Sequence, residues 1–358
     1  MTLEHAIPKF LNGSKSPERF KVKAACRQCN NNLGIYVDAS FEKSYLVSLA
    51  LTEAAQYAAK LGARVIPPLV CCGQLNIELG SLGDEEVCEW WVGSQGEHVV
   101  LIRPKADDLF WYMGGRPTDL KKASANGRAY YFCNQNADHL KSLEQFRESF
   151  ARRKVKKYLC TEVDGVDVRD YGFLLPDDKE KIVIKDLWRI LFGGNAVPGT
   201  IPYASDFDVR FMCKLAIGVA YCEFGGSYLQ SKTAIELNEG LWFMGGGEPP
   251  KLNGLRPMNN PIDDPINKIA TCEQGAVSFL LWSGEDEVVL CLNVNQKHIW
   301  AVVVARKGEI DEDLFAKFSE GHIVQLGMDG TVLDMGLPKY LLLRFEKEGQ
   351  KGSGDVQV

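Results

Sequence analysis

Two short stretches near the start of the chain decide the fold of its first part: EHAIP at residues 4–8 and CRQCNNNLG at residues 26–34, with VDA following at residues 37–39. In the first stretch an acidic residue stands beside a histidine. A proline then ends the extended segment, because proline cannot donate a hydrogen bond to a neighbouring strand. Adjacent side chains of an extended segment point to opposite faces, so Glu4 and His5 can serve different functions. The second stretch is a Cys-x-x-Cys pair with three asparagines directly behind it.

The order of these stretches resembles the core of HNH-type endonucleases, and most of all the bacterial members with an E/D-H-I-I-P string ahead of a C-x-x-C-N/H knuckle. The resemblance covers residues 4 to 39, about a tenth of the chain. It implies a ββα-metal unit with Glu4 as the acidic residue, His5 as the general base and Asn30 as the last active-site residue, on the helix that the knuckle opens. It also implies hydrolysis of DNA, often in phage defence or mobile elements, where a double-strand break needs a dimer or a second event.

The residue types suit the chemistry of phosphodiester hydrolysis, which deprotonates a water and stabilises charge on the leaving oxygen, a task for a divalent cation. A histidine suits the first step because its unperturbed pKa lies near the operating pH. Oxygen ligands from Glu4 and the Asn30 amide suit a hard cation such as Mg²⁺ or Mn²⁺, with phosphate and waters completing its coordination. We therefore expect Glu4 and Asn30 to bind a catalytic metal ion beside His5.

Two departures from the family pattern bear on this expectation. Family members usually carry a first Cys-x-x-Cys upstream of the Glu-His pair, and structural zinc takes four ligands, so Cys26 and Cys29 form only a partial zinc knuckle here. Zinc is then lost, or is completed by distant ligands, or the true gene start lies further upstream. Vicinal Cys71 and Cys72 are the nearest candidates, but such cysteines in an apolar run are typically small buried residues. The family also has an asparagine that orients the base histidine shortly before the knuckle, where this chain has FKV at residues 20–22.

Positive charge is concentrated around the HNH-like stretches. Residues 1 to 35 hold two acidic residues and six basic ones, a net of +4, while the whole chain is −6, so the remainder is −10. The basic residues are Lys9, Lys15, Arg19, Lys21, Lys23 and Arg27. A basic face of this kind favours contact with a nucleic-acid backbone, although a solvated loop rich in lysine would show the same composition. A second basic run, residues 152–157, lies at the end of a predicted helix, where cations also favour the helix dipole.

Composition places the chain among ordinary globular proteins of two or three domains, with 358 residues, 46% of them hydrophobic and 25% charged. No apolar run approaches the roughly 18 residues of a membrane span and no charged-then-apolar leader is present, so we expect no membrane association and a cytoplasmic location. Eleven irregularly spaced cysteines fit that compartment better than a secreted disulfide framework. No Walker-type loop, Gly-x-Gly-x-x-Gly, Gly-x-Ser-x-Gly or His-Glu-x-x-His string supports another catalytic system.

The hydrophobic patterns predict an α+β protein: an HNH-like ββα-metal unit followed by a larger mixed α/β remainder with antiparallel sheets and two or three long helices. The expected segments are residues 1–62, the nuclease unit with a supporting helix over 40–61; 63–160, a β-rich domain; 161–348, a mixed helix and strand domain; and 349–358, a flexible tail. Strands are expected at 64–71, 87–92, 98–102, 109–113, 129–133, 277–282, 287–294, 298–304 and 339–345, with further strands between 158 and 201. Helices are expected at 136–157, 205–224 and 227–241, and a long loop at 245–267.

Two alternatives to a nuclease stay open from the sequence. The HNH-like unit could be a catalytically inactive nucleic-acid-binding or protein-docking module, or Cys26 and Cys29 could form a redox-responsive pair. Aromatic residues in the 63–135 region could stack nucleic-acid bases or could belong to the core of the sheet. Metal-dependent DNA cleavage would distinguish the first alternative, and thiol titration the second.

Overall fold

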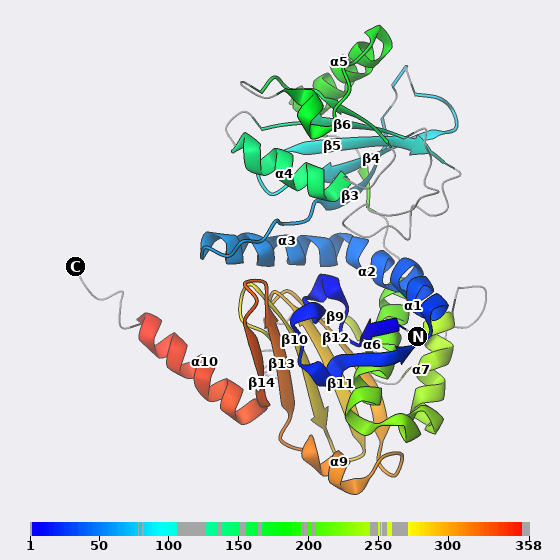
Figure 1. Cartoon of the computed structure of the whole chain (residues 1–358), viewed down its shortest axis with the longest axis vertical. Helices are drawn as coiled ribbons and strands as arrows, with labels where there is room; N and C mark the ends of the chain where they lie inside the picture. Colours follow the sequence, from blue (N-terminus) through cyan, green and yellow to red (C-terminus); the bar gives the residue numbers. More distant parts are fainter. Residues whose placement is uncertain are drawn as a thin grey trace. The chain divides into compact units, whose positions relative to one another are not determined.

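The computed structural model describes residues 2–77, 79–80, 82–105, 127–134, 138–150, 155–163, 167–194, 196, 199–201, 205–243, 250, 252, 256–259 and 271–352 (Figure 1). The chain divides into two compact units. The first comprises Met1–Val37, Tyr57–Val65 and Ala204–Val358, and the second Asp38–Gln56 and Ile66–Tyr203. The expected α+β class is confirmed, because each unit combines helices with a six-stranded sheet. The predicted segments 1–62 and 161–348 each contribute residues to both units.

The first unit begins with a β-hairpin. Strand β1 (Thr2–His5) pairs antiparallel with β2 (Lys21–Ala25), and its last two residues lie opposite Val22 and Lys21. Three short 3-10 turns, η1 (Lys9–Leu11), η2 (Gly13–Lys15) and η3 (Glu18–Phe20), connect the strands and bury apolar side chains at residues 7, 11 and 20. Helix α1 (Arg27–Leu33) follows β2 and packs against β1, and the π-helical segment η4 (Gly34–Asp38) continues from it.

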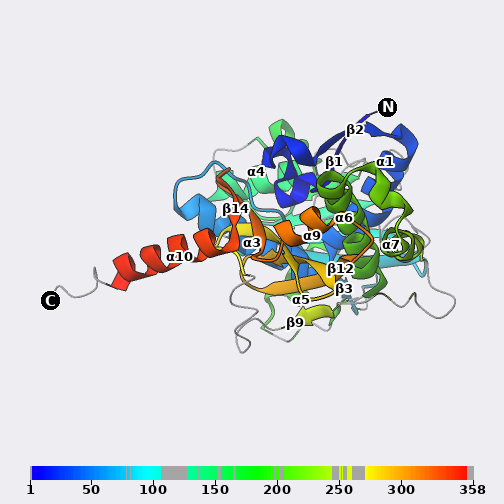
Figure 2. The same cartoon turned by 90° about the horizontal axis from the view of Figure 1, so that it is seen from below.

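A six-stranded antiparallel sheet in the order β14-β13-β10-β11-β12-β9 forms the rest of the first unit. Its strands are β9 (Arg256–Asn259), β10 (Ala276–Ser283), β11 (Glu287–Val294), β12 (His298–Arg306), β13 (His322–Gly327) and β14 (Val332–Gly336). Helices α6 (Ser205–Phe224) and α7 (Lys232–Trp242) pack side by side and against β12 (Figure 2). Between α6 and α7 lies η7 (Gly226–Gln230), and α9 (Glu312–Lys317) precedes β13.

The expected strand at 339–345 is wrong, since these residues belong to helix α10 (Leu337–Gly352). Leu337 and Tyr340 are buried against Leu280 and Ile323 of the sheet, while Leu342 and Phe345 are exposed. The apolar run therefore follows a helical period with one buried face rather than the alternation of a strand. Residues 353–358 of the expected tail, and 260–270 of the expected loop, lie outside the described residues.

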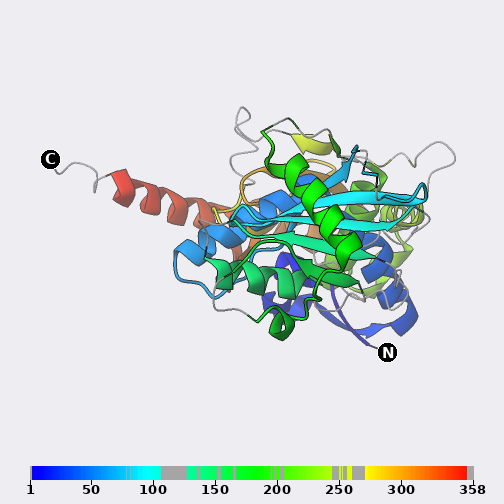
Figure 3. The same ribbon diagram turned by 90° about the horizontal axis from the view of Figure 1, so that it is seen from above.

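The second unit has a six-stranded sheet in the order β7-β6-β5-β4-β3-β8. Its strands are β3 (Val70–Leu75), β4 (Glu86–Val92), β5 (His98–Pro104), β6 (Arg128–Phe132), β7 (Lys156–Leu159) and β8 (Gly199–Thr200). Helix α4 (His139–Phe150) packs into the core on one face with Trp91 and Tyr131. Helix α5 (Asp178–Phe192) lies across the strands and packs into a second core with Tyr130 and Phe132 (Figure 3). The short turn η6 (Val168–Tyr171) precedes α5.

Several predictions for the second unit need correction. The helix expected over 136–157 ends at Phe150, and Lys156 and Lys157 instead lie in β7, which pairs parallel with β6. Strands were expected where α5 lies, because its apolar residues include a β-branched IVI run and only part of them is buried. The first strand begins six residues later than expected, at Val70. Residues 109–113 and 152–154 lie outside the described residues.

The helix expected over 40–61 is two helices, α2 (Ala39–Lys43) and α3 (Tyr45–Lys60), separated by Ser44 in an extended conformation. The aromatic side chains at 91 and 130–132 are fully buried and form core, so they offer no base-stacking surface. No helix in the described part of the chain is both long and apolar enough to cross a membrane.

Candidate active site

The hairpin and α1 place the three residues expected to be catalytic on adjoining elements. Glu4 and His5 end strand β1, and Asn30 lies in the middle of α1. Helix α1 starts directly after β2, with the backbone N–H of Asn30 donating to the carbonyl of Cys26 at 2.9 Å. Because α1 packs against β1, the strand that carries the acid and the base adjoins the helix that carries the amide. The order of elements along residues 2–33 is therefore strand, strand, helix.

A glycine and an asparagine fix the loop after His5: Gly13 packs against the backbone of Ile7, and Asn12 binds the backbone of Gly327. A Cβ atom at Gly13 would lie 1.7 Å from the carbonyl oxygen of Ile7, so only glycine permits this approach. Asn12 adopts a left-handed conformation (φ 62°), and its Nδ2 donates to the carbonyl of Gly327 at 2.6 Å. The N–H of Ala6 donates to the carbonyl of Phe20 at 2.8 Å. These contacts fix the backbone of the loop that directly follows His5, the candidate base.

Replacing Gly13 with alanine is expected to lower the free energy of unfolding by about 1–3 kcal/mol, because backbone atoms must move to admit the methyl group. The same substitution at Gly34, where an added Cβ meets nothing within 4 Å, is the matched control. Urea unfolding followed by circular dichroism measures both. Equal stability of the two variants would mean that Gly13 is not packed against Ile7 in solution.

The surroundings of His5 favour its neutral form. Burial lowers the pKa of His5 below 6.5, and the positive charges of Lys9 and Lys21 lower it further, while Glu18 opposes them. A histidine with a lowered pKa is unprotonated at neutral pH and can accept a proton from water. His5 is therefore neutral at neutral pH, the form in which an imidazole can accept a proton.

This electrostatic setting predicts the pH dependence of any hydrolytic activity. A base with a lowered pKa stays active to lower pH than an ordinary histidine would, because its imidazole becomes protonated only at a more acidic pH. Lys21→Gln removes one cation and releases Glu18, its ion-pair partner. Both changes raise the pKa of His5, so the acidic limb of the rate profile should move to higher pH. Lys15→Gln, outside the groups that shift His5, is the control, and an unmoved limb in Lys21→Gln would refute this electrostatic role.

Glu4 has a charged partner that the sequence did not indicate. Lys214 of α6 places its Nζ 3.1 Å from Glu4 Oε1, with 7% of the lysine side chain exposed and 20% of the glutamate. The lysine stands in an apolar stretch of α6 between buried Cys213 and Leu215. A lysine within an apolar stretch indicates that its ammonium group has a buried acidic partner. The sequence does not indicate which acidic residue that is. A pocket of about 320 Å³ adjoins the pair, with a mostly apolar lining that includes Val22, Leu33 and Gly218.

A divalent cation fits this site by the chemistry of its donors. No three His, Cys, Asp or Glu side chains gather closely enough to hold a metal ion anywhere in the described ranges. An ion bound by Glu4 and Asn30 would take its other ligands from water and phosphate, as Mg²⁺ does at sites with one or two carboxylates. A carboxylate offers about four lone-pair positions, so Glu4 can serve both Lys214 and a cation.

The knuckle cysteines do not make a structural zinc site with the described residues. Cys26 and Cys29 are exposed, and two thiolates supply half of the four ligands that structural zinc takes. Hydrogen bonds from the backbone and side chain of Cys29 lower the pKa of Cys26, whereas a hydrogen bond with Cys26 raises the pKa of Cys29. Cys26 is therefore the more easily ionised of the two.

The eleven cysteines, all within the described part of the chain, are unpaired thiols, and their environments predict which react. Burial raises the pKa of Cys213, Cys272 and Cys291 each to about 12. Thiol labelling of the native protein at neutral pH should therefore modify Cys26 first and Cys29 next, with the buried thiols of Cys71, Cys88, Cys133, Cys213 and Cys272 labelled only after denaturation. Mass spectrometry of peptides identifies the modified sites. Early labelling of Cys213 or Cys272 would contradict the burial described here.

The six basic residues expected to contact nucleic acid lie in different settings. Lys9, Lys15 and Arg27 are exposed. Lys21 is paired with Glu18. Lys23 lies in β2, and its side chain is outside the described part of the structure. These positions leave Lys9, Lys15 and Arg27 as the members most available for a phosphate backbone.

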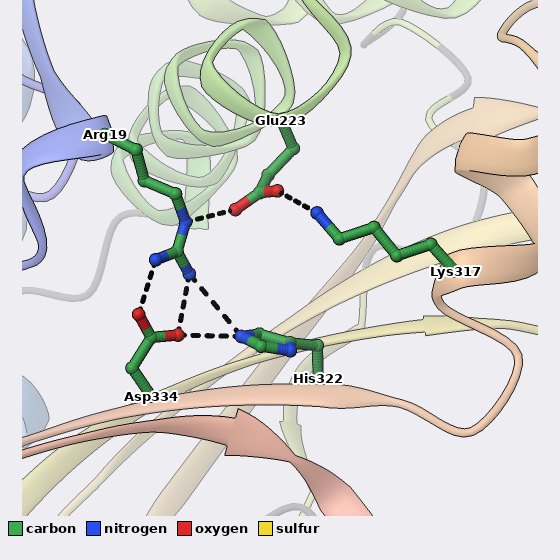
Figure 4. A network of polar contacts seen from close by, with 5 residues as sticks. All are labelled: Arg19, Glu223, Lys317, His322 and Asp334. Carbon is green, nitrogen blue, oxygen red and sulfur yellow. Dashed lines mark hydrogen bonds and ion pairs between the residues drawn. The ribbon is translucent and has the colours of Figure 1, made fainter.

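The sixth, Arg19, belongs to an ionic network within the first unit (Figure 4). Its Nε donates to Glu223 of α6 at 2.7 Å, and its Nη1 and Nη2 donate to both oxygens of Asp334 on β14. Glu223 also pairs with Lys317 at 2.8 Å, and His322 lies 2.7 Å from Asp334. The hydrogen bond from Arg19 lowers the pKa of Asp334 to about 2, despite partial burial. Arg19 thus joins the HNH-like hairpin to α6 and to the edge of the sheet.

Comparisons of the chain with protein-family models, with curated proteins and with solved structures find no match.

Proposed function

We propose that this chain is a metal-dependent endonuclease of the HNH type that hydrolyses DNA phosphodiester bonds. The observation that carries the proposal is the hairpin and helix that bring Glu4, His5 and Asn30 onto adjoining elements, with His5 held neutral by its surroundings. The order of residue types along residues 4–39 supports the same assignment.

In the proposed mechanism His5 accepts a proton from the attacking water through an imidazole nitrogen. Glu4 and the side-chain oxygen of Asn30 would hold Mg²⁺ or Mn²⁺, which when bound stabilises negative charge on the phosphate and leaving oxygens. Lys214 holds the Glu4 carboxylate in place through their ion pair. The exposed Lys9, Lys15 and Arg27 would neutralise neighbouring backbone phosphates, a contact that weakens as salt rises. One such site cuts one strand, so a double-strand break would need a homodimer or a second cut.

Cleavage of supercoiled plasmid and of single-stranded DNA by the purified protein tests this function, in Mg²⁺, in Mn²⁺ and with EDTA. Metal-dependent nicking is the expected result, and single-stranded RNA run in parallel shows whether ribose substrates are also cut. No cleavage in either metal would refute the catalytic proposal. Cytoplasmic action in phage defence or on a mobile element belongs to the same proposal, through the resemblance alone.

The Glu4–Lys214 ion pair favours one second candidate function. A metal ligand that already carries an ammonium partner at 3.1 Å fits a hairpin that has lost catalysis and serves as a nucleic-acid-binding or protein-docking module. Salt-sensitive DNA binding without cleavage in any metal would support that module. Cleavage would exclude it.

A further inference from the structure

A second pocket of the first unit, of about 450 Å³, lies where the start of β10, the end of β13 and α10 meet. Its size falls within the range of about 300–1,000 Å³ typical of small-molecule sites. The pocket is lined by several amide and charged side chains, together with residues of the last turns of α3. Hydrogen bonds and an ion pair to neighbouring residues hold the polar side chains of this lining in place.

Gln325 lines this pocket with its side-chain amide. The side chain is 3% exposed. Its Oε1 accepts hydrogen bonds from the N–H of Glu273 and from the hydroxyl of Tyr340, both at 2.8 Å. The Glu273 N–H can only donate, so the atom that it meets is the oxygen and the amide orientation is determined. Within the described residues Nε2 of Gln325 has no hydrogen-bond partner, so this donor is available to an acceptor in the pocket.

Two cations of α10, Arg344 and Lys347, line the same pocket three residues apart. Arg344 Nη1 donates to the carbonyl of Thr271 at 2.8 Å, which holds the guanidinium in place. Lys347 pairs with Glu273 at 2.7 Å, and its side chain is 58% exposed. The planar donor fork of a guanidinium such as that of Arg344 is suited to binding an anion.

The opposite wall is less polar, with Tyr57, Ala58 and Leu61 at the end of α3. An aromatic ring beside aliphatic carbon suits a flat heterocycle. We propose that this pocket binds a nucleoside monophosphate. The phosphate lies against Arg344 and Lys347, a carbonyl of the base accepts from Gln325 Nε2, and the base ring packs on Tyr57. This inference is independent of the proposed nuclease activity.

Isothermal titration of the full-length protein with AMP, GMP, CMP and UMP tests the proposal, with EDTA present so that no metal site contributes. Inorganic phosphate and glutamate serve as comparison ligands. At least one nucleotide should bind saturably at millimolar concentration or below, and more tightly than either comparison ligand. Phosphate binding equal to that of every nucleotide would identify a simple anion site and overturn the proposal. Glutamate binding best, or no binding, would overturn it as well.

Four variants locate the site. Arg344→Gln should weaken nucleotide binding by about tenfold or more, because a charge-assisted hydrogen bond is lost. Gln325→Glu keeps the acceptor oxygen but removes the N–H donor, and should weaken it by a similar factor. Lys347→Gln, at an exposed position, should weaken nucleotide binding severalfold even if Gln325→Glu fails to fold. Lys339→Gln, a cation of α10 outside the pocket, should bind as the wild type does. Unchanged binding in Arg344→Gln and Lys347→Gln would overturn the assignment.

Discussion

Replacing His5 with alanine should lower the rate of metal-dependent DNA cleavage by about 10²–10⁴-fold, the usual contribution of a general base. The structure places His5 at the end of β1 with a lowered pKa, so its neutral imidazole is the group able to accept the proton of the attacking water. The loss should appear in kcat more than in KM, because the imidazole acts on the water and not on DNA binding. Multiple-turnover nicking of supercoiled plasmid measures both parameters.

Three controls separate a chemical role for His5 from a structural one. His5→Asn retains a polar side chain without a useful base and should be as inactive as His5→Ala. His5→Gly opens space in which added imidazole should restore part of the rate. His139→Gln, a histidine of the second unit, should cleave as the wild type does. Full activity of His5→Asn would show that the base lies elsewhere.

Replacing Glu89 with glutamine should lower the free energy of unfolding by about 3–5 kcal/mol, since it removes a buried carboxylate charge that two buried cations contact. Glu89 on β4 is fully buried. Its Oε2 accepts from Arg103 Nε at 3.1 Å, and its Oε1 lies 3.7 Å from Lys43 Nζ. The side chains of Arg103 and Lys43 are 4% and 7% exposed. Solvent can therefore do little to replace the lost charge.

Glu86, on the same strand, supplies the matched control. Its pair with Arg128 lies at 2.8 Å but is partly exposed, with 26% and 20% of the two side chains accessible. Glu86→Gln should therefore cost about 1 kcal/mol or less. Calorimetry should show a melting temperature lower by roughly 10 °C for Glu89→Gln. A loss in Glu89→Gln no larger than that in Glu86→Gln would contradict the burial of this triad. The double variant Glu89→Gln/Arg103→Met should recover part of the loss.

Local pattern was enough to predict the elements whose apolar period is regular. Helix α6 has the expected bounds, Ser205–Phe224, because a long apolar run starts after Ser205 and two glycines follow Phe224. The three strands β10, β11 and β12 lie within two residues of their expected positions, since each is a run rich in β-branched and aromatic residues bounded by turns.

Prediction failed where amphipathic helices carry exposed apolar residues. In α5, Ile182, Trp188 and Phe192 are substantially exposed, and Val183 and Leu187 are the buried aliphatic residues. The exposed apolar residues hide the helical period of the buried ones, so the sequence resembles that of a strand. Residues 339–345 of helix α10 were predicted as a strand for the same reason, because Leu342 and Phe345 lie on the exposed face of the helix.

The partners of the candidate site residues lay beyond any local pattern. Arg19 was predicted as a nucleic-acid contact from composition, but it binds Asp334, 315 residues away in the sequence. Lys214 of α6 reaches Glu4 across a similarly large separation. Such contacts form only when distant parts of the chain pack together. Glu4, His5 and Asn30, by contrast, lie within one short stretch of sequence, so they could be selected as candidates from that stretch alone. The candidate chemistry was therefore predictable, and its electrostatic surroundings were not.

The most direct test of the central claim compares the wild-type protein with His5→Ala. The rate at which each protein nicks supercoiled plasmid in Mg²⁺ is measured before and after EDTA is added. If Glu4, His5 and Asn30 form a metal-dependent nuclease, the wild type nicks in Mg²⁺, EDTA stops it, and His5→Ala is slower by about two orders of magnitude or more. Equal rates for the two proteins, or no nicking by the wild type in Mg²⁺ or Mn²⁺, would contradict the claim.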